Sequence, residues 1–172
     1  AGTGAMRKEI KGHEKEISSV AVNPDGKTVA SAGYDKTIKI WNVESGALLH
    51  TLKDHDEPVM NLSFCADGSL LLSIDYNRSL KLWMPKSGEL VKTIKLGKYY
   101  SGYAGAISPD GRLIVSSGWE ATGLGKSSYF EGSKIKFWEA GSGDLLREIV
   151  MMKGSKSDVL CASLNPDEGL LG

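Results

Sequence analysis

The chain has 172 residues, 41% hydrophobic and 24% charged, which is ordinary globular composition with enough apolar material for a core. Its 21 basic residues balance 21 acidic ones, so the zero net charge argues against nucleic acid or an anionic membrane as the main partner. No apolar run approaches the roughly 20 residues of a membrane-spanning helix. Two cysteines, Cys65 and Cys161, are too few for a disulfide framework, so we expect a reducing, cytoplasmic location.

The most informative feature of the sequence is a repeat of about 42 residues. The turn at Asn23–Gly26 returns at Cys65–Gly68 and at Ser108–Gly111, and the starts of these turns lie 42 and 43 residues apart. Ile40-Trp41 returns 42 residues later as Leu82-Trp83. Because several landmarks keep one spacing, the sequence predicts a repeat architecture.

Within each copy, short β-rich runs alternate with turn residues. In the first copy the runs cover 17–22, 28–33, 37–42 and 47–52, and Gly, Asp, Asn and Pro lie between them. We expect each copy to form a four-stranded antiparallel sheet, with strands a to d in chain order. One such sheet cannot bury both of its faces, so several must pack against each other.

These landmarks resemble the WD-repeat β-propeller family over essentially the whole chain, with Gly12-His13 and Trp41-Asn42 standing where that family has Gly-His and Trp-Asp. The resemblance implies an all-β fold, a β-propeller of four-stranded antiparallel blades with about three complete blades and two partial ones. The expected divisions are 1–12 (outer strand of a preceding blade), 13–53 (blade 1), 54–96 (blade 2), 97–153 (blade 3) and 154–172 (start of a further blade). Propellers of this family usually have seven blades, so we expect a fragment of a longer chain; self-association through exposed blade edges is the alternative.

The resemblance also implies a hydrogen-bonded set of His, Ser or Thr, Asp and Trp that locks each blade. The first copy has His13, Ser31, Asp35 and Trp41; the second has His55, Ser73 and Trp83, with Asn77 aligned to Asp35; the third keeps Ser116 and Trp138, with Lys98 in place of His. A set that recurs and weakens along the chain indicates a structural role rather than a nucleophilic triad. We therefore expect no catalytic residue, no metal and no cofactor.

A binding site is expected where the third copy departs from the repeat. Ser116 and Trp138 are 22 residues apart, whereas Ser31 and Trp41 are 10 apart, which places an insertion at 119–133 between strands b and c. Aromatic side chains dominate interface hot spots, and long loops on rigid scaffolds often carry binding. The candidate partner-binding residues are Trp119, Tyr129, Phe130, Tyr99, Tyr100 and Tyr103, with Tyr34, Tyr76 and Arg78 as weaker neighbours. Alternatively, Tyr103 packs within its own strand and the insertion folds over its own blade.

These observations favour a non-catalytic scaffold for protein–protein interaction. A sensor or regulatory array attached to a signalling enzyme, such as an NTPase or kinase, is the alternative. An enzyme that uses the propeller channel is less favoured, because the expected inner strands carry no cluster of His or carboxylate residues.

Overall fold

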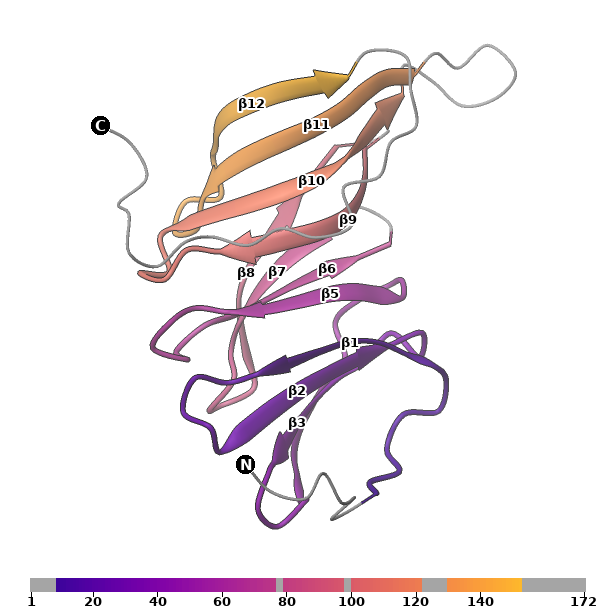
Figure 1. Ribbon diagram of the computed structural model, residues 1–172, viewed down its shortest axis with the longest axis vertical. Coiled ribbons are helices and arrows are strands. Elements are labelled where there is room, and N and C mark those ends of the chain that lie inside the picture. The colour runs from indigo at the N-terminus through magenta and orange to yellow at the C-terminus, as the bar shows by residue number, and fades with distance from the viewer. Residues whose placement is uncertain (1–8, 77–78, 98–99, 122–129, 153–172) are drawn as a thin grey trace, which may run out of the picture.

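The structure is a computed structural model that describes residues 9–76, 79–97, 100–121 and 130–152, with side chains for all of these except 100–103, 119–121, 130–132 and 152. The described strands form three four-stranded antiparallel sheets, each with its strands in chain order (Figure 1). Blade 1 comprises β1 (Ile17–Val22), β2 (Thr28–Gly33), β3 (Ile38–Asn42) and β4 (Leu48–Leu52). Blade 2 comprises β5 (Val59–Phe64), β6 (Leu71–Asp75), β7 (Ser79–Met84) and β8 (Glu89–Lys95). Blade 3 comprises β9 (Tyr100–Ile107), β10 (Leu113–Ala121), β11 (Phe130–Glu139) and β12 (Leu145–Met152).

The turn between the first two strands is built in the same way in every blade. In blade 1 the Asp25 carboxylate accepts the backbone N–H groups of Lys27 and Thr28, at 2.7 and 3.0 Å. Gly26 adopts a φ of 65°, a left-handed conformation that glycine accepts without a Cβ clash. Asp67 and Asp110 accept the N–H groups two residues further on in the same manner. The recurring Asp-Gly pair therefore sets each hairpin through local chemistry.

The blades stack face to face, and their first strands lie side by side, β1 against β5 and β5 against β9 (Figure 1). Blade 2 is buried on both faces. Leu71 and Leu72 are consecutive residues of β6, and both are fully buried. Leu71 packs in the apolar cluster shared with blade 1, and Leu72 packs in the cluster shared with blade 3. Successive side chains of a strand point to opposite faces, so one strand serves two interfaces.

Blade 3 shows what becomes of the insertion predicted at 119–133. The described ends of the insertion lengthen the hairpin, because β10 and β11 remain paired from Leu113–Glu139 out to Ala121–Phe130. Residues 122–129 lie outside the described part of the chain. The expected partial blades cannot be compared in full, since 1–8 and 153–172 are also outside it; residues 9–12 form no strand.

Candidate functional site

The first candidate group is the hydrogen-bonded set of blade 1. Trp41 Nε1 of β3 donates to Ser31 Oγ of β2 at 2.8 Å. Ser31 Oγ lies 2.8 Å from His13 Nε2, and His13 Nδ1 lies 2.9 Å from an oxygen of Asp35. Because a carboxylate only accepts, the hydrogen-bond network assigns the proton to Nδ1, and Nε2 then accepts from the serine hydroxyl. The bonds therefore run in one direction, from Trp41 to Asp35.

Asp35 is held as an anion by several donors. Burial acts to raise the pKa of its carboxyl group, but the backbone N–H of Glu14, the hydroxyl and N–H of Thr37, and the ring of His13 together lower that pKa to about 2. The Glu14 N–H lies 3.0 Å away and the Thr37 hydroxyl 2.8 Å away. The carboxylate thus ties the segment before β1 to the turn before β3.

Blade 2 contains the same set with one change of residue. His55 Nε2 lies 2.7 Å from Ser73 Oγ, which accepts the Trp83 Nε1–H at 2.8 Å. The carboxylate at His55 Nδ1 is Asp75, at 2.9 Å. The repeat spacing predicts Asn77 at this place, but the carboxylate beside His55 is that of Asp75. Asn77 itself lies outside the described residues.

The reason for the change lies at the end of the second strand. Asp75 is the repeat counterpart of Gly33, and a Cβ on Gly33 would lie 3.2 Å from His13 Nδ1. A side chain at this position therefore points at the imidazole. The Asp35 and Asp75 carboxylates also accept the N–H of counterpart residues, Thr37 at 3.1 Å and Ser79 at 2.9 Å. The carboxylate therefore lies at Nδ1 of the histidine in both blades, although it comes from different backbone positions.

In blade 3 the described residues keep the bond between tryptophan and serine, from Trp138 Nε1 to Ser116 Oγ at 2.9 Å. Lys98, which the sequence placed where the other blades have histidine, lies outside them. The serines are inaccessible to a substrate in all three blades: Ser31, Ser73 and Ser116 are at most 5% exposed. A nucleophile needs access to its substrate, so this geometry supports a stabilising role.

The second candidate group is a pair of exposed tyrosines. Tyr34 and Tyr76 occupy counterpart positions at the turns after β2 and β6, and are 42% and 51% exposed. Their backbones are fixed, because the Tyr34 N–H donates to the Glu16 carbonyl at 2.9 Å and the Tyr76 N–H donates to the Pro58 carbonyl at 2.8 Å. In blades 1 and 2 the connection before the first strand therefore lies beside the connection after the second strand, and each of these two blades presents a tyrosine there.

Four of the remaining partner-binding candidates lie on the described strands of blade 3. Strand pairing aligns Tyr100 of β9 with Glu120, next to Trp119 in β10, and aligns Phe130 of β11 with Ala121. These three aromatic positions therefore share one end of the blade. Tyr103 falls at the irregularity between β9 and β10. The side chains of these four residues, together with Tyr99, Tyr129 and Arg78, are outside the described part.

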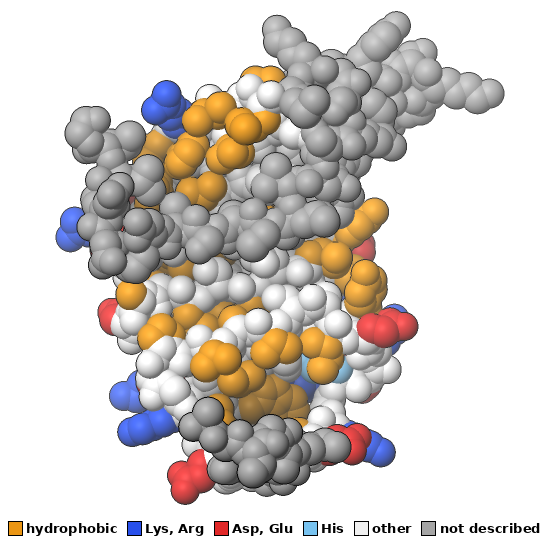
Figure 2. All heavy atoms as spheres, viewed as in Figure 1, with side chains coloured by type: hydrophobic (Ala, Val, Ile, Leu, Met, Phe, Trp, Pro, Cys, Tyr) orange, Lys and Arg blue, Asp and Glu red, His pale blue; other side chains and the backbone are white. Residues whose placement is uncertain are grey.

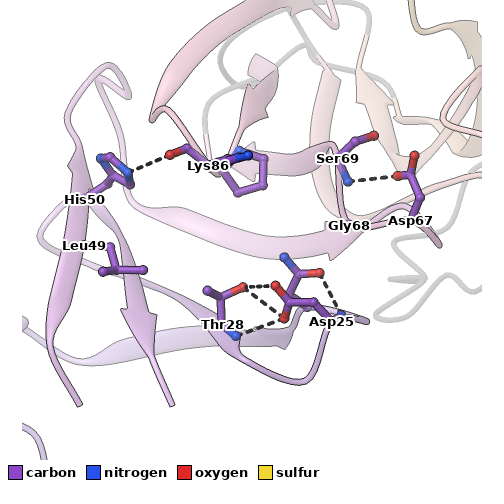
Figure 3. Close-up of a pocket in the computed structure, with 10 residues that line it drawn as sticks. Asp25, Thr28, Leu49, His50, Asp67, Gly68, Ser69 and Lys86 are labelled. Atoms are coloured by element: carbon purple, nitrogen blue, oxygen red, sulfur yellow. Dashed lines mark hydrogen bonds between the residues drawn. The ribbon is translucent and has the colours of Figure 1, made fainter. Parts of the chain in front are cut away.

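Sequence reasoning missed a cleft of about 410 Å³ between blades 1 and 2 (Figure 3). His50 of β4 is half-buried in its wall and donates from Nε2 to the Lys86 carbonyl at 3.1 Å. The carboxylates of Asp25 and Asp67 are engaged by their own turns. No local sequence signal could reveal this cleft, because its walls come from two repeats.

Within the described residues, no three His, Cys, Asp or Glu side chains are grouped so that they could hold a metal ion. That part of the chain also contains no helix long and apolar enough to cross a membrane.

Comparison with known proteins agrees with the blade geometry. The family model "WD domain, G-beta repeat" matches residues 4–42 and 46–84. The chain carries WD40 repeats. Its three sheets superimpose on the solved structure of U3-55K with a TM-score of 0.68 and 22% identity, over 81% of this chain and 41% of that one. The WD40 repeats of RRP9 superimpose with the same TM-score and identity, over 40% of that chain. The expected β-propeller blades are confirmed.

The WD40 chain is also similar to curated proteins over single repeats. It is 43% identical over 35 residues to the ribosome biogenesis protein WDR12 homolog of Brugia malayi, and 53% identical over 34 residues to the U3 small nucleolar RNA-associated protein 13 of Saccharomyces cerevisiae. It is 46% identical over 37 residues to THO complex subunit 3 of Arabidopsis thaliana. These stretches cover 20 to 22% of this chain and 8%, 4% and 12% of the relatives, so the chain spans a small part of each.

Proposed function

We propose that this WD40 chain is a non-catalytic scaffold that binds a protein partner through the edge formed by the connections around Tyr34 and Tyr76. The observation that carries the proposal is the exposure of two aromatic side chains at counterpart positions, 42% and 51%. Large exposed aromatic side chains on a fixed backbone lose little entropy on binding, and such residues dominate interface hot spots.

Two further observations support this role. The serine and histidine side chains that a nucleophilic triad would use are buried inside the blades. Two proteins that resemble this chain over a single repeat are named a ribosome biogenesis protein and a subunit of the THO complex. Both names fit proteins that act within multiprotein assemblies. Cys65 is a buried free thiol, which fits the reducing, cytoplasmic location that we propose with it.

The proposal is tested by selecting peptide ligands from a phage-displayed library on the immobilised chain. The affinity of each selected peptide is then measured for the wild type and for the double variant Tyr34→Ala/Tyr76→Ala. We expect the double variant to bind about tenfold more weakly or worse, since hot-spot aromatics contribute more than about 1.4 kcal/mol.

Val91→Ala is the matched control, because Val91 is 49% exposed on the outer strand β8, away from the tyrosines. It should bind the peptides as the wild type does. Selected peptides whose affinity is unchanged in the double variant would show that binding occurs elsewhere.

A further inference from the structure

The cleft between blades 1 and 2 has a volume of about 410 Å³, within the range of about 300–1,000 Å³ that is typical of ligand pockets. Its ten lining residues all belong to these two neighbouring blades, so a further blade of the same ring would not fill it. Leu49 and His50 of β4 form one wall, and the turns that join β1 to β2, β5 to β6 and β7 to β8 form the others (Figure 3). These turns lie at the end of the blades opposite to Tyr34 and Tyr76.

The corresponding junction between blades 2 and 3 is bridged by contacts that blade 1 cannot make. The Ala66 N–H donates to the Pro109 carbonyl at 3.1 Å and so joins the first turns of blades 2 and 3. The counterpart of Ala66 in blade 1 is Pro24, which has no N–H to donate. Leu70 packs against the apolar cluster shared by blades 2 and 3, whereas its counterpart Thr28 is shorter and polar. The cleft therefore arises from the residues by which blade 1 differs from blade 2.

The carboxylate of Asp67 in this cleft lacks the basic neighbour that the other two blades provide. Two residues after the carboxylate of each first turn, the chain has Lys27 in blade 1, Ser69 in blade 2 and Arg112 in blade 3. Among the described residues, no lysine or arginine forms an ion pair with Asp67. Hydrogen bonds from the Cys65 thiol and from Ser69 lower the pKa of Asp67 to about 2, so this carboxylate is charged at neutral pH.

Asp67 also retains an acceptor for a ligand. The Cys65 thiol and the Ser69 N–H both donate to Oδ1, at 3.0 and 2.8 Å, whereas a carboxylate can accept at both of its oxygens. Apolar surface lines the cleft as well, since Leu49 is 46% exposed and Pro85 forms part of the lining. Lysine and arginine side chains combine an apolar stem with a cationic end. They therefore match both parts of this lining.

The charged residues of the lining are two aspartates, Asp25 and Asp67, and one lysine, Lys86, which favours a cation over an anion. Figure 2 shows acidic and basic side chains along the left side of the view, where the first turns of blades 1 and 2 lie in Figure 1. We propose that the cleft binds a lysine or arginine side chain of a partner protein, with its cationic group at Asp67 and its stem against Leu49 and Pro85. This site is separate from the surface around the exposed tyrosines.

NMR titration of the isotope-labelled chain measures this binding with three capped amino acids as probes. N-acetyl-arginine amide and N-acetyl-lysine amide carry the stem and the charge, whereas N-acetyl-citrulline amide has nearly the shape of the arginine probe but no charge. We expect both charged probes to shift the amide signals of Gly68 and Ser69 in a saturable way. The citrulline probe should bind about fivefold more weakly, the upper range for an ion pair at a protein surface.

Two variants and a matched control locate the binding. Asp67→Asn removes the charge but retains an oxygen that can accept the Ser69 N–H, so the affinity for both charged probes should fall to that for citrulline. Asp110→Asn is the control, because Asp110 occupies the same turn of blade 3, outside the cleft, and this variant should bind as the wild type does. Thr28→Leu introduces the residue that blade 2 has at Leu70, and should abolish binding of all three probes by filling the cleft. Thermal unfolding verifies that every variant is folded.

The proposal is overturned if the charged probes produce no saturable shifts at the cleft, or if the citrulline probe binds as tightly as they do. It is also overturned if Asp110→Asn weakens binding as much as Asp67→Asn, which would indicate a general attraction to turn carboxylates, or if Thr28→Leu binds as the wild type does. The Tyr34→Ala/Tyr76→Ala variant should bind the charged probes normally, because the tyrosines lie at the other end of the blades.

Discussion

A serine hydroxyl joins the two ring systems of each complete set, Ser31 in blade 1 and Ser73 in blade 2. Each hydroxyl accepts the indole N–H and stands within hydrogen-bond distance of the imidazole. The surroundings differ, since Trp83 is 2% exposed whereas Trp41 is half-buried. A buried donor that loses its acceptor costs about 1–3 kcal/mol, so the same hydroxyl matters more in blade 2, where water cannot replace it.

The depressed pKa of Asp35 predicts a loss of stability in acid. The pKa is about 2 in the folded chain against an ordinary 3.8, and the side chain is only 6% exposed. A lowered folded pKa contributes stability above pH 3.8 that is lost as the pH falls toward 2. The shift corresponds to about 2 kcal/mol, about half of it lost by pH 3.

Urea unfolding of the wild type and of Asp35→Asn at several pH values measures this contribution. The difference in unfolding free energy between them should be largest near pH 6 and shrink toward pH 3, because the variant has no carboxyl group to titrate at this position. A difference that stays constant over this range would show that the charge of Asp35 contributes no stability.

At the scale of strands and turns, the sequence was a good guide wherever the chemistry was local. The four runs predicted in the first copy agree with β1 to β4 to within one residue, because alternation and Asp-Gly turns act over a few residues. The role of Asp75 was not predictable in this way. It depends on where the strand β6 directs a side chain relative to His55, which comes from the loop before β5, and alignment by loop position selected Asn77 instead.

Gly105 in β9 shows how closely neighbouring blades approach. A Cβ at this position would lie 2.3 Å from Ile74 Cδ1 in blade 2 and 3.0 Å from the Val115 carbonyl oxygen in blade 3. We predict that Gly105→Ala destabilises the chain by about 1–3 kcal/mol, the usual cost of overpacking. Adding Ile74→Val should recover part of the loss, since it removes Cδ1 but leaves the carbonyl contact.

Urea denaturation of the two single variants and of the double variant measures this coupling. Gly141→Ala is the matched control, since a Cβ there would meet nothing within 4 Å. If Gly105→Ala is as mild as Gly141→Ala, or if the effects of Gly105→Ala and Ile74→Val simply add, then Gly105 and Ile74 do not hold the two blades in close contact.

At the scale of the whole molecule, packing against blade 2 stabilises both blade 1 and blade 3. The two apolar clusters of the described residues both include side chains of this blade, and they share none. In stacked repeats each unit is stabilised chiefly by its neighbours, so a blade at one end can loosen while the rest stays folded. The middle blade is consequently the element whose packing determines whether three sheets behave as one body.

Leu71 and Leu72 allow the two interfaces to be weakened separately. Both are fully buried in β6, but they pack on opposite faces. Leu71→Ala and Leu72→Ala should each cost about 2–5 kcal/mol. Native-state hydrogen exchange followed by mass spectrometry should show faster exchange mainly in blade 1 for Leu71→Ala and mainly in blade 3 for Leu72→Ala, because each variant removes contacts with a different neighbour. The same exchange pattern in both variants would mean that the three blades open as a single cooperative unit, and that the separate clusters do not give the blades separate stabilities.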